Sequence, residues 1–360
     1  MNTLKSILSI LLVTLFVSCD SNEDNNTATT CESDFFGFSS STSYINSGDT
    51  FSFGKYHKSG TLGALTTISS GNALTGSTGW INYYASTYNP TLNELTCLLP
   101  SNNSLIKCNT TTGATTTTSI GNVAAPTYLG TSLLLLKYSS AVMSSSSVYP
   151  KITSVAVQIV DATGTSVSGT ATTINLTSNS LSAMKQISSA TDGTKIYYLA
   201  NCELIIYDTV THNFNVKTID TYDNDTNRKF YQGLELKNNN TLVALKQTVV
   251  PSTKIEITAV DITNLTPTTL PNTSVFNITQ SLLPSSAPTL AVIINAAEYR
   301  TTTYDTCDDN YYFTYTTPSV VAAASTKIFE VKLNSTATSP TVNVYTDGSS
   351  SILFALEKGQ

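Results

Sequence analysis

CELIIYDTVTHNFNVKTID, residues 202–220, reads as two alternating strands joined by a turn. Apolar and polar side chains alternate along 204–208, which is the pattern of a strand whose side chains point to opposite faces. Residues 211–213 provide a turn signal, and the alternation resumes at Phe214. The segment therefore predicts a β-hairpin whose first strand ends at an acidic residue, Asp208.

The same hairpin recurs along the chain. Comparable strands end at Asn109, Asp161, Asp208 and Asp261, and each is followed by a turn and a second strand. These residues are about 50 positions apart, while Asn334 ends a further copy after a longer interval. Units of this length with four short antiparallel strands are typical of propeller blades, which must pack around an axis because neither blade face is stable in water.

We therefore predict an all-β fold, a β-propeller of six blades with four antiparallel strands each, with seven as the alternative blade count. The predicted blades span residues 35–70, 79–121, 125–177, 181–221, 230–276 and 288–346. Residues 351–357 form a spare strand, which we expect to complete the first blade and close the ring, because an open edge would invite aggregation. A pair of β-sandwiches or an irregular β-solenoid is the alternative architecture.

The strand and turn LIIYDTVTHN, residues 204–213, resembles the repeats of YVTN/WD40-like bacterial propellers. In those repeats an apolar strand runs into Asp-Thr before the turn. The resemblance implies a propeller domain, which we place at residues 35–360.

The N-terminus has the features of an export signal. Lys5 gives it a positive start, and the apolar run 7–17 is too short to span a bilayer, which takes about 20 residues. The end of this run, LFVSC at residues 15–19, resembles the bacterial lipobox. The resemblance implies a lipoprotein signal peptide at 1–18 and lipidation, including palmitate, at Cys19, while an ordinary signal peptide is the alternative.

Residues 19–34 are polar and acidic and predict a disordered tether. Acidic residues directly behind the modified cysteine resemble the surface-export signals of Bacteroidetes lipoproteins. The resemblance implies an outer-membrane protein anchored by its lipid and facing the cell surface, with the periplasmic side as the alternative. Asp208-Thr209-Val210 also resembles the Bacteroidetes sequon for O-glycosylation, which makes Thr209 a candidate acceptor.

The composition excludes a nucleic-acid-binding surface. The formal net charge is −6, only 12% of residues are charged, and the chain has two arginines, Arg228 and Arg300. Such a chain has no cationic patch with which to displace the counterions of a phosphate backbone.

The cysteines permit disulfides because an exported protein meets an oxidising environment. Cys97 and Cys108 lie symmetrically about Asn102-Asn103, a two-residue hairpin turn, so we expect them to face each other and to be able to form a bridge. Two buried thiols are the alternative. The pairing of Cys31, Cys202 and Cys307 stays open.

Two acidic loops are candidate calcium sites, because Ca²⁺ prefers oxygen ligands from closely spaced residues. The first contains Asp223, Asp225 and Asn227, and the second contains Asp305, Asp308 and Asp309. The alternative for each is a solvated connection without a metal. The longer interval before Asn334 suggests an insertion, and we expect the loop 304–310 to be that insertion and to lie at one rim of the ring.

Tyrosine is abundant, with 19 copies. Tyr304, Tyr311 and Tyr312 are candidate ligand contacts, because tyrosine offers a flat apolar face and a polar tip. No GxSxG, HExxH or P-loop pattern is present, so we assign no catalytic residue.

The expected function is therefore binding or scaffolding without catalysis, with a glycan or a protein as ligand. The alternative is an exported carbohydrate-active hydrolase or lyase whose site lies at the propeller axis. A group of carboxylates at the axis would favour the enzyme, and a mouth rich in tyrosine but poor in carboxylates would favour binding.

Overall fold

The chain divides into two units, Met1–Glu32 and Ser33–Gln360. The computed structural model describes residues 34–40, 44–45, 50–59, 61–62, 66–73, 79–80, 85–99, 104–143, 151–180, 187–222, 228–250, 252–295, 301–316, 326–333, 341–346 and 352–358, all of them in the second unit. The predicted signal peptide, Cys19, and the tether up to residue 33 lie outside the described residues. Among the described helices, none has both the length and the apolar character that crossing a membrane requires.

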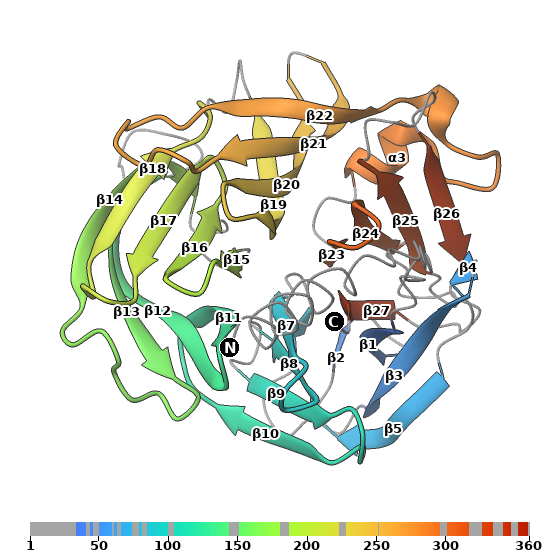
Figure 1. Ribbon diagram of the computed structural model, residues 1–360, viewed down its shortest axis with the longest axis horizontal. Helices are drawn as coiled ribbons and strands as arrows, with labels where there is room; N and C mark the ends of the chain where they lie inside the picture. Colours follow the sequence, from blue (N-terminus) through green and yellow to red (C-terminus); the bar gives the residue numbers. More distant parts are fainter. Residues whose placement is uncertain are drawn as a thin grey trace, which may run out of the picture. The chain divides into compact units, whose positions relative to one another are not determined.

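The second unit is a six-bladed β-propeller (Figure 1). Each blade is one antiparallel sheet, and its strands are named from the innermost outward. Blade one contains β27 (Ile352–Lys358), β1 (Asp34–Ser40), β3 (Thr50–Ser59) and β5 (Thr66–Ala73), with the short β4 (Thr61–Leu62) also paired to β3. Blade two contains β7 (Ala85–Asn89), β8 (Glu94–Leu99), β9 (Ser104–Asn109) and β10 (Thr115–Ser119). Blade three contains β11 (Val123–Leu129), β12 (Ser132–Met143), β13 (Lys151–Asp161) and β14 (Thr172–Ser180).

The remaining three blades follow the same plan. Blade four contains β15 (Ser188–Thr191), β16 (Lys195–Ala200), β17 (Glu203–Asp208) and β18 (Phe214–Thr218). Blade five contains β19 (Lys229–Asn238), β20 (Thr241–Thr248), β21 (Lys254–Asp261) and β22 (Asn272–Ile278). Blade six contains β23 (Thr302–Asp305), β24 (Asn310–Thr316), β25 (Thr326–Lys332) and β26 (Val342–Thr346). Outside the blades, β2 (Tyr44–Ile45) pairs with β6 (Gly79–Trp80).

The C-terminal strand closes the ring, as the sequence predicts. β27 pairs antiparallel with β1, with Leu356 opposite Gly37, and becomes the innermost strand of blade one. Contacts between innermost strands run from β27 through β7, β11, β15, β19 and β23 and return to β27. The ring of blades therefore has no open end, which is the expected reason for combining the two ends of the domain in one blade.

Apolar side chains are buried between blades rather than inside any one blade. The described residues form six hydrophobic clusters, and each cluster joins two neighbouring blades. The cluster of Phe35, Tyr312, Ile328 and Leu356, for example, connects blade six to blade one. Both faces of a blade are therefore apolar, which explains why inner and middle strands such as 204–207 are buried on every residue.

The repeated Asn or Asp has one structural role in all copies that the structure describes. It ends the third strand of its blade, and its side-chain Oδ1 accepts backbone N–H groups of the turn that follows. Asp208 Oδ1 accepts from Val210 N at 3.0 Å and Thr211 N at 2.8 Å, and Asn109 Oδ1 from Thr112 N at 2.8 Å. Asp161 and Asp261 do the same for the turns of blades three and five.

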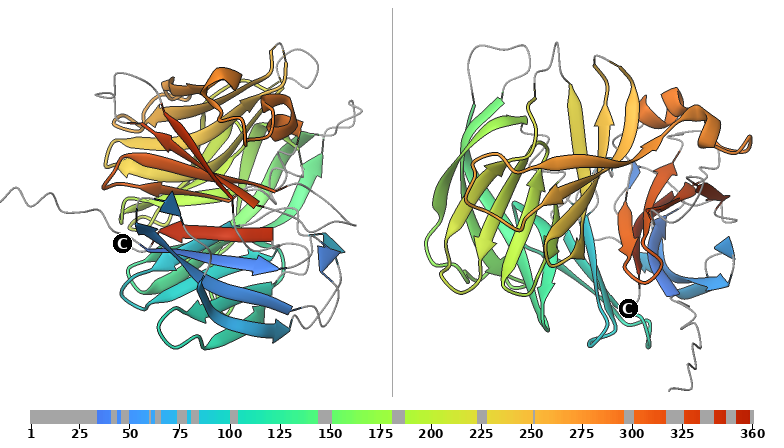
Figure 2. Two further views of the ribbon diagram at one scale, coloured as in Figure 1. Left: turned by 90° about the vertical axis from the view of Figure 1, so that its right-hand side faces the viewer. Right: turned by 45° about the horizontal axis from the view of Figure 1, so that its top comes forward.

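The insertion predicted by the long interval lies elsewhere than expected. Residues 304–310 form the end of β23, a short turn and the start of β24, which is an ordinary hairpin. The extra residues lie in 279–301, the connection from blade five to blade six, which contains the 3₁₀ helix η1 (Gln280–Leu282) and α3 (Leu290–Asn295) (Figure 2). Leu283 and Ile293 of this connection pack into the core between those two blades.

The predicted Cys97–Cys108 bridge is wrong. The register of β8 and β9 places Cys97 opposite Ile106 and Cys108 opposite Leu95. Leu99 pairs with Ser104, whereas a two-residue turn at 102–103 would place residue 101 opposite Ser104. Both side chains are free, buried thiols in the core between blades one and two. Cys202 is also free and buried, whereas Cys307 is disulfide-bonded.

Candidate functional site

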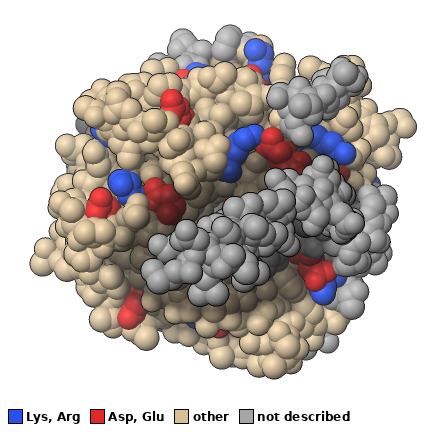
Figure 3. All heavy atoms as spheres, in the orientation of Figure 1, with Lys and Arg blue, Asp and Glu red and all other residues tan. Residues whose placement is uncertain are grey.

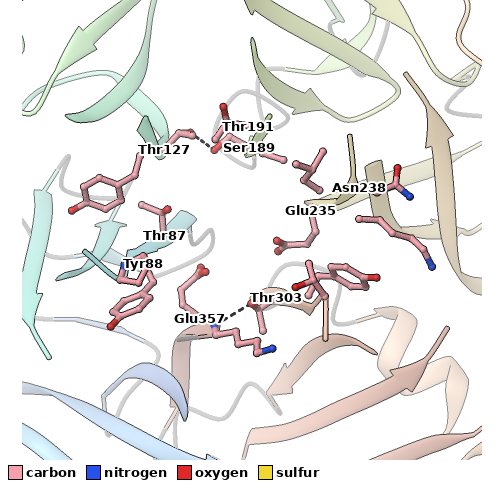
Figure 4. A pocket seen from close by; sticks show the side chains of 17 residues that line it. Thr87, Tyr88, Thr127, Ser189, Thr191, Glu235, Asn238, Thr303 and Glu357 are labelled. Carbon is pink, nitrogen blue, oxygen red and sulfur yellow. Dashed lines mark hydrogen bonds between the residues drawn. The ribbon is translucent and has the colours of Figure 1, made fainter. Parts of the chain in front are cut away.

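A cavity of about 490 Å³ lies on the propeller axis, enclosed by the six innermost strands (Figure 4). Its volume is within the range of about 300–1,000 Å³ that is usual for small-molecule sites. Its lining comprises Thr87, Tyr88, Pro90, Thr127, Tyr128, Ser189, Ala190, Thr191, Glu235, Leu236, Lys237, Asn238, Thr303, Tyr304, Thr306, Glu357 and Lys358.

Hydroxyl groups from four different blades line this cavity. Thr87, Thr127, Ser189 and Thr303 each stand two residues before the last paired residue of their innermost strand, so the blades present them at matching heights. Thr127 Oγ1 and Ser189 Oγ share a hydrogen bond of 2.5 Å, which connects blades three and four. Each hydroxyl can both donate and accept, so this part of the wall suits a ligand with many polar groups.

The other two blades contribute carboxyl groups. Glu235 of β19 and Glu357 of β27 both extend into the cavity (Figure 4). Ser86 Oγ donates to Glu357 Oε1 at 2.5 Å, and Thr302 Oγ1 donates to Glu235 Oε1 at 3.3 Å. The two glutamates lie on either side of blade six and are the only carboxylates among the described residues that line this cavity.

A β-bulge aims Glu235 at the axis. The pairing of β19 with β20 shifts between Gln232 and Glu235, and Gly233 adopts φ +66° there. Bulges re-aim side chains near functional sites, and this one needs glycine because a left-handed backbone strains other residues. The hydroxyl of Tyr311 donates to the Gly233 carbonyl at 2.5 Å, and Leu234 N donates to Ser188 Oγ at 2.9 Å, so both neighbouring blades hold the bulge.

Protonation is favoured at both glutamates. Burial raises the pKa of Glu357 to about 7, because removal from water disfavours the ionised form. Burial, reinforced by the charge of Glu357, raises the pKa of Glu235 well above its usual range. Two such groups in one cavity titrate as a coupled pair, and at neutral pH the pair retains a proton.

Two ion pairs stand at the edge of the cavity. The Lys358 ammonium contacts the carboxylate of Asp305, and both side chains are buried. Lys237 Nζ lies 2.6 Å from Asp309 Oδ1, which also accepts a hydrogen bond of 2.5 Å from the Tyr304 hydroxyl. These contacts fix the turn between β23 and β24 against β19 and β27.

The structure does not arrange Asp305, Asp308 and Asp309, the described set of predicted calcium ligands, as a metal site. Asp305 and Asp309 each face a different lysine, which supplies the neutralising charge that a metal would have supplied. Within the described ranges no group of three or more His, Cys, Asp or Glu side chains could hold a metal ion. Asp308 lies in the turn between them, and Asp223, Asp225 and Asn227 fall outside the described residues.

Only one of the three predicted tyrosine contacts reaches the cavity. Tyr304 lines it, whereas Tyr311 and Tyr312 are fully buried between blades, so their assignment as ligand contacts is wrong. Their hydroxyls serve the protein itself, since Tyr311 holds the bulge at Gly233 and Tyr312 donates to Glu330 Oε1 at 2.9 Å. Thr209 is partly exposed, and its hydroxyl donates to the Thr194 carbonyl at 2.7 Å, while its glycosylation stays a prediction.

The sequence interpretation missed Glu235 and Glu357. A glycine inside a strand pattern is a signal of a bulge, and Gly233 precedes Glu235 by two residues. A glutamate within the closing strand was a second signal, because the innermost strands alone can reach the axis.

Charged side chains are sparse and mixed on the face shown in Figure 3. Acidic and basic groups alternate there among uncharged residues, in agreement with the 12% charged content of the chain.

Several solved structures resemble this chain at low sequence identity. A candidate 6-phosphogluconolactonase from Bacteroides fragilis is 10% identical with a TM-score of 0.46, covering 92% of this chain and 99% of its own. Apo AztD from Citrobacter koseri is 8% identical with a TM-score of 0.39, over 91% and 98% of the two chains. A protein from Lactobacillus plantarum is 9% identical with a TM-score of 0.42, over 91% and 99%. At these TM-scores and identities we draw no conclusion about this chain from the similarity.

No family model matches the chain, and no curated protein matches it.

Proposed function

We propose that this protein is a binding protein without catalytic activity, which holds a small polyhydroxylated ligand of the saccharide class in its axial cavity. The observation that carries the proposal is the cavity wall, in which all six innermost strands contribute an oxygen-bearing side chain. Hydroxyl and carboxyl groups together offer the mixed donors and acceptors that sugar hydroxyls require. A volume of about 490 Å³ suits a small sugar and excludes a folded protein from the cavity.

A carbohydrate-active hydrolase is the second candidate, and one observation favours it. Glu235 and Glu357 share a cavity, and the raised pKa of each is the property that a general acid needs near neutral pH. Binding is preferred because hydroxyl side chains from four blades make up most of the polar wall, and these groups bind sugar hydroxyls but do not perform glycoside hydrolysis.

A saccharide panel tests both candidates in one experiment. We expect titration calorimetry with mono- and disaccharides to give binding that Thr127→Val and Thr303→Val weaken by about tenfold, since each removes a hydroxyl from the wall. The same mixtures, left to stand and assayed for new reducing ends, should show no turnover. Turnover that Glu357→Gln abolishes would establish the hydrolase instead, and an absence of binding across the panel would contradict the proposal.

We further propose that Cys19 carries a lipid that anchors the protein to the outer membrane, facing the cell surface. The support is the LFVSC sequence and the acidic segment behind it. Cys19→Ala should move the protein from the membrane fraction to the soluble fraction. Cys202→Ala, which removes a free thiol of the propeller, is the matched control that should stay with the membrane. Exposure can then be tested with protease added to intact cells, because only a surface-facing protein is digested.

A further inference from the structure

The two cavity glutamates have no cationic partner among the residues that the structure describes. Each accepts a hydrogen bond from one hydroxyl, Ser86 for Glu357 and Thr302 for Glu235. The lysines that line the same cavity are already engaged, Lys358 with Asp305 and Lys237 with Asp309. These four carboxylates and two lysines carry two excess negative charges when all are ionised.

These unpaired carboxylates reduce the stability of the folded protein without a ligand. Buried charges are stable when they are paired, and an unpaired carboxylate gains a proton instead. The raised pKa values of both glutamates express this cost. Structures keep unfavourable groups of this kind at functional sites, where a ligand provides the missing partner.

We infer that the axial cavity selects a saccharide that carries a free, protonated amine, and that its ammonium group binds between Glu235 and Glu357. This inference rests on the proposed function, because the hydroxyls of the wall would bind the rest of the same ligand. An ammonium group donates three hydrogen bonds, and carboxylates are its strongest acceptors.

A bare metal ion fits this cavity poorly. Calcium takes six to eight oxygens at about 2.3–2.6 Å, which requires ligands that converge on one point. Here the oxygen-bearing side chains come from six strands around a space of about 490 Å³. In its ionised form either glutamate repels an anionic sugar and attracts an amine.

Binding of the amine should release the proton that the glutamate pair holds, because the ammonium group stabilises both carboxylates in their ionised form. Other titratable or charged groups surround the pair on the elements that pack against it. These are Tyr88, Tyr128, Cys97, Lys237, Tyr304, Asp305, Asp309 and Lys358. Burial raises the pKa of Tyr128, Tyr304 and Cys97 further above neutrality, so these three hold their protons near pH 7.

The test compares four matched sugars at pH 7 by titration calorimetry: D-glucosamine, N-acetyl-D-glucosamine, D-glucose and D-glucuronate. We expect glucosamine to bind about tenfold or more tightly than glucose and N-acetylglucosamine, and glucuronate to bind most weakly. Titration in buffers with different ionisation enthalpies should show proton release for glucosamine and none for glucose.

Substitutions test whether Glu235 and Glu357 cause the preference for the amine and the proton release. Combining Glu235→Gln with Glu357→Gln should remove both the preference for the amine and the proton release while glucose still binds. Glu256→Gln on β21, away from the cavity, is the matched control and should leave both unchanged. Equal affinity for glucosamine and glucose would overturn this inference and leave the proposed function standing. Failure of all four sugars to bind would overturn the proposed function and this inference with it.

Discussion

Gly233→Ala is expected to be among the most damaging single substitutions in the protein, with a loss of roughly 3 kcal/mol in the free energy of unfolding. An alanine Cβ at this position would lie 2.2 Å from Thr302 Cγ2, 2.3 Å from Thr302 Oγ1 and 2.5 Å from the Tyr311 hydroxyl. These atoms belong to β23 and β24 of the next blade, so relief of the clash would move blade six away from blade five. The change should therefore reduce stability and displace Glu235 from the cavity at the same time.

Gly130→Ala is the matched control. Gly130 also has a left-handed backbone, with φ +59°, but no atom lies within 4 Å of the position that its Cβ would take. Its substitution should cost only the backbone strain, about 1 kcal/mol. Chemical denaturation of both variants separates the two contributions. Similar losses for Gly233→Ala and Gly130→Ala would contradict the tight packing of the bulge against blade six.

The contrast between Gly233 and the repeated Asp residues explains which parts of the molecule were predictable. The capping role of Asp208 is local, since it depends on a strand end and the next three residues of the chain. That role repeats in blades two, three, four and five, so it is visible in the sequence and leads to the blade count. The direction of the Glu235 side chain depends on contacts with Thr302 and Tyr311. These two residues are distant from Glu235 in the chain, so no local sequence pattern predicts the contacts.

The error in the predicted pairing of β8 with β9 also arose from information that the local sequence does not contain. The Cys97–Cys108 prediction assumed the shortest turn about Asn102-Asn103, and the longer connection moved the pairing by two residues. Both cysteines lie on the same sheet face in the predicted and in the observed register. The alternative of two buried thiols was therefore compatible with either register. Side-chain alternation specifies the face of a strand, but it does not distinguish registers that differ by two residues.

The site itself was predictable only in outline. A ligand site at the axis follows from the propeller fold, but the sequence does not show which side chains reach it. Tyr311 and Tyr312 were misassigned because a tyrosine in a strand pattern gives no sign of whether its hydroxyl meets solvent or Glu330. The acidic turn 305–309 was interpreted as a metal loop because its lysine partners lie on β19 and β27, far away in sequence.

Glu357→Gln should stabilise the protein, and the gain should depend on pH. Burial raises the pKa of Glu357 to about 7 in the folded state, whereas a glutamate in the unfolded chain has a pKa of about 4.3. Between these values the folded state holds a proton that the unfolded state has released, so stability decreases as pH rises through this window. Above about pH 7 the penalty is complete. The full shift would correspond to roughly 3.7 kcal/mol, and we expect about 2 kcal/mol because Glu357 is not fully buried and solvent screens part of the effect.

Glutamine keeps the shape of the protonated acid and does not ionise, so it removes this penalty. Denaturant unfolding of Glu357→Gln should match the parent protein near pH 4 and exceed it by about 2 kcal/mol at pH 8. The Ser86 hydroxyl can still donate to the amide oxygen of the new residue, which preserves the local hydrogen bond. Glu235→Gln should act in the same direction, and the double variant should gain less than the sum, because removal of one carboxyl lowers the pKa of the other.

Removing any acidic residue relieves repulsion in a chain with a net charge of −6, so a matched control is needed. Glu256→Gln provides it, because Glu256 lies on β21, two strands from the axis, and does not line the cavity. A gain at pH 8 that Glu256→Gln reproduces would mean that Glu357 experiences only the overall charge. A gain confined to Glu357→Gln and Glu235→Gln would show that the axial carboxylates reduce stability at neutral pH, which is the cost that a cationic ligand would offset on binding.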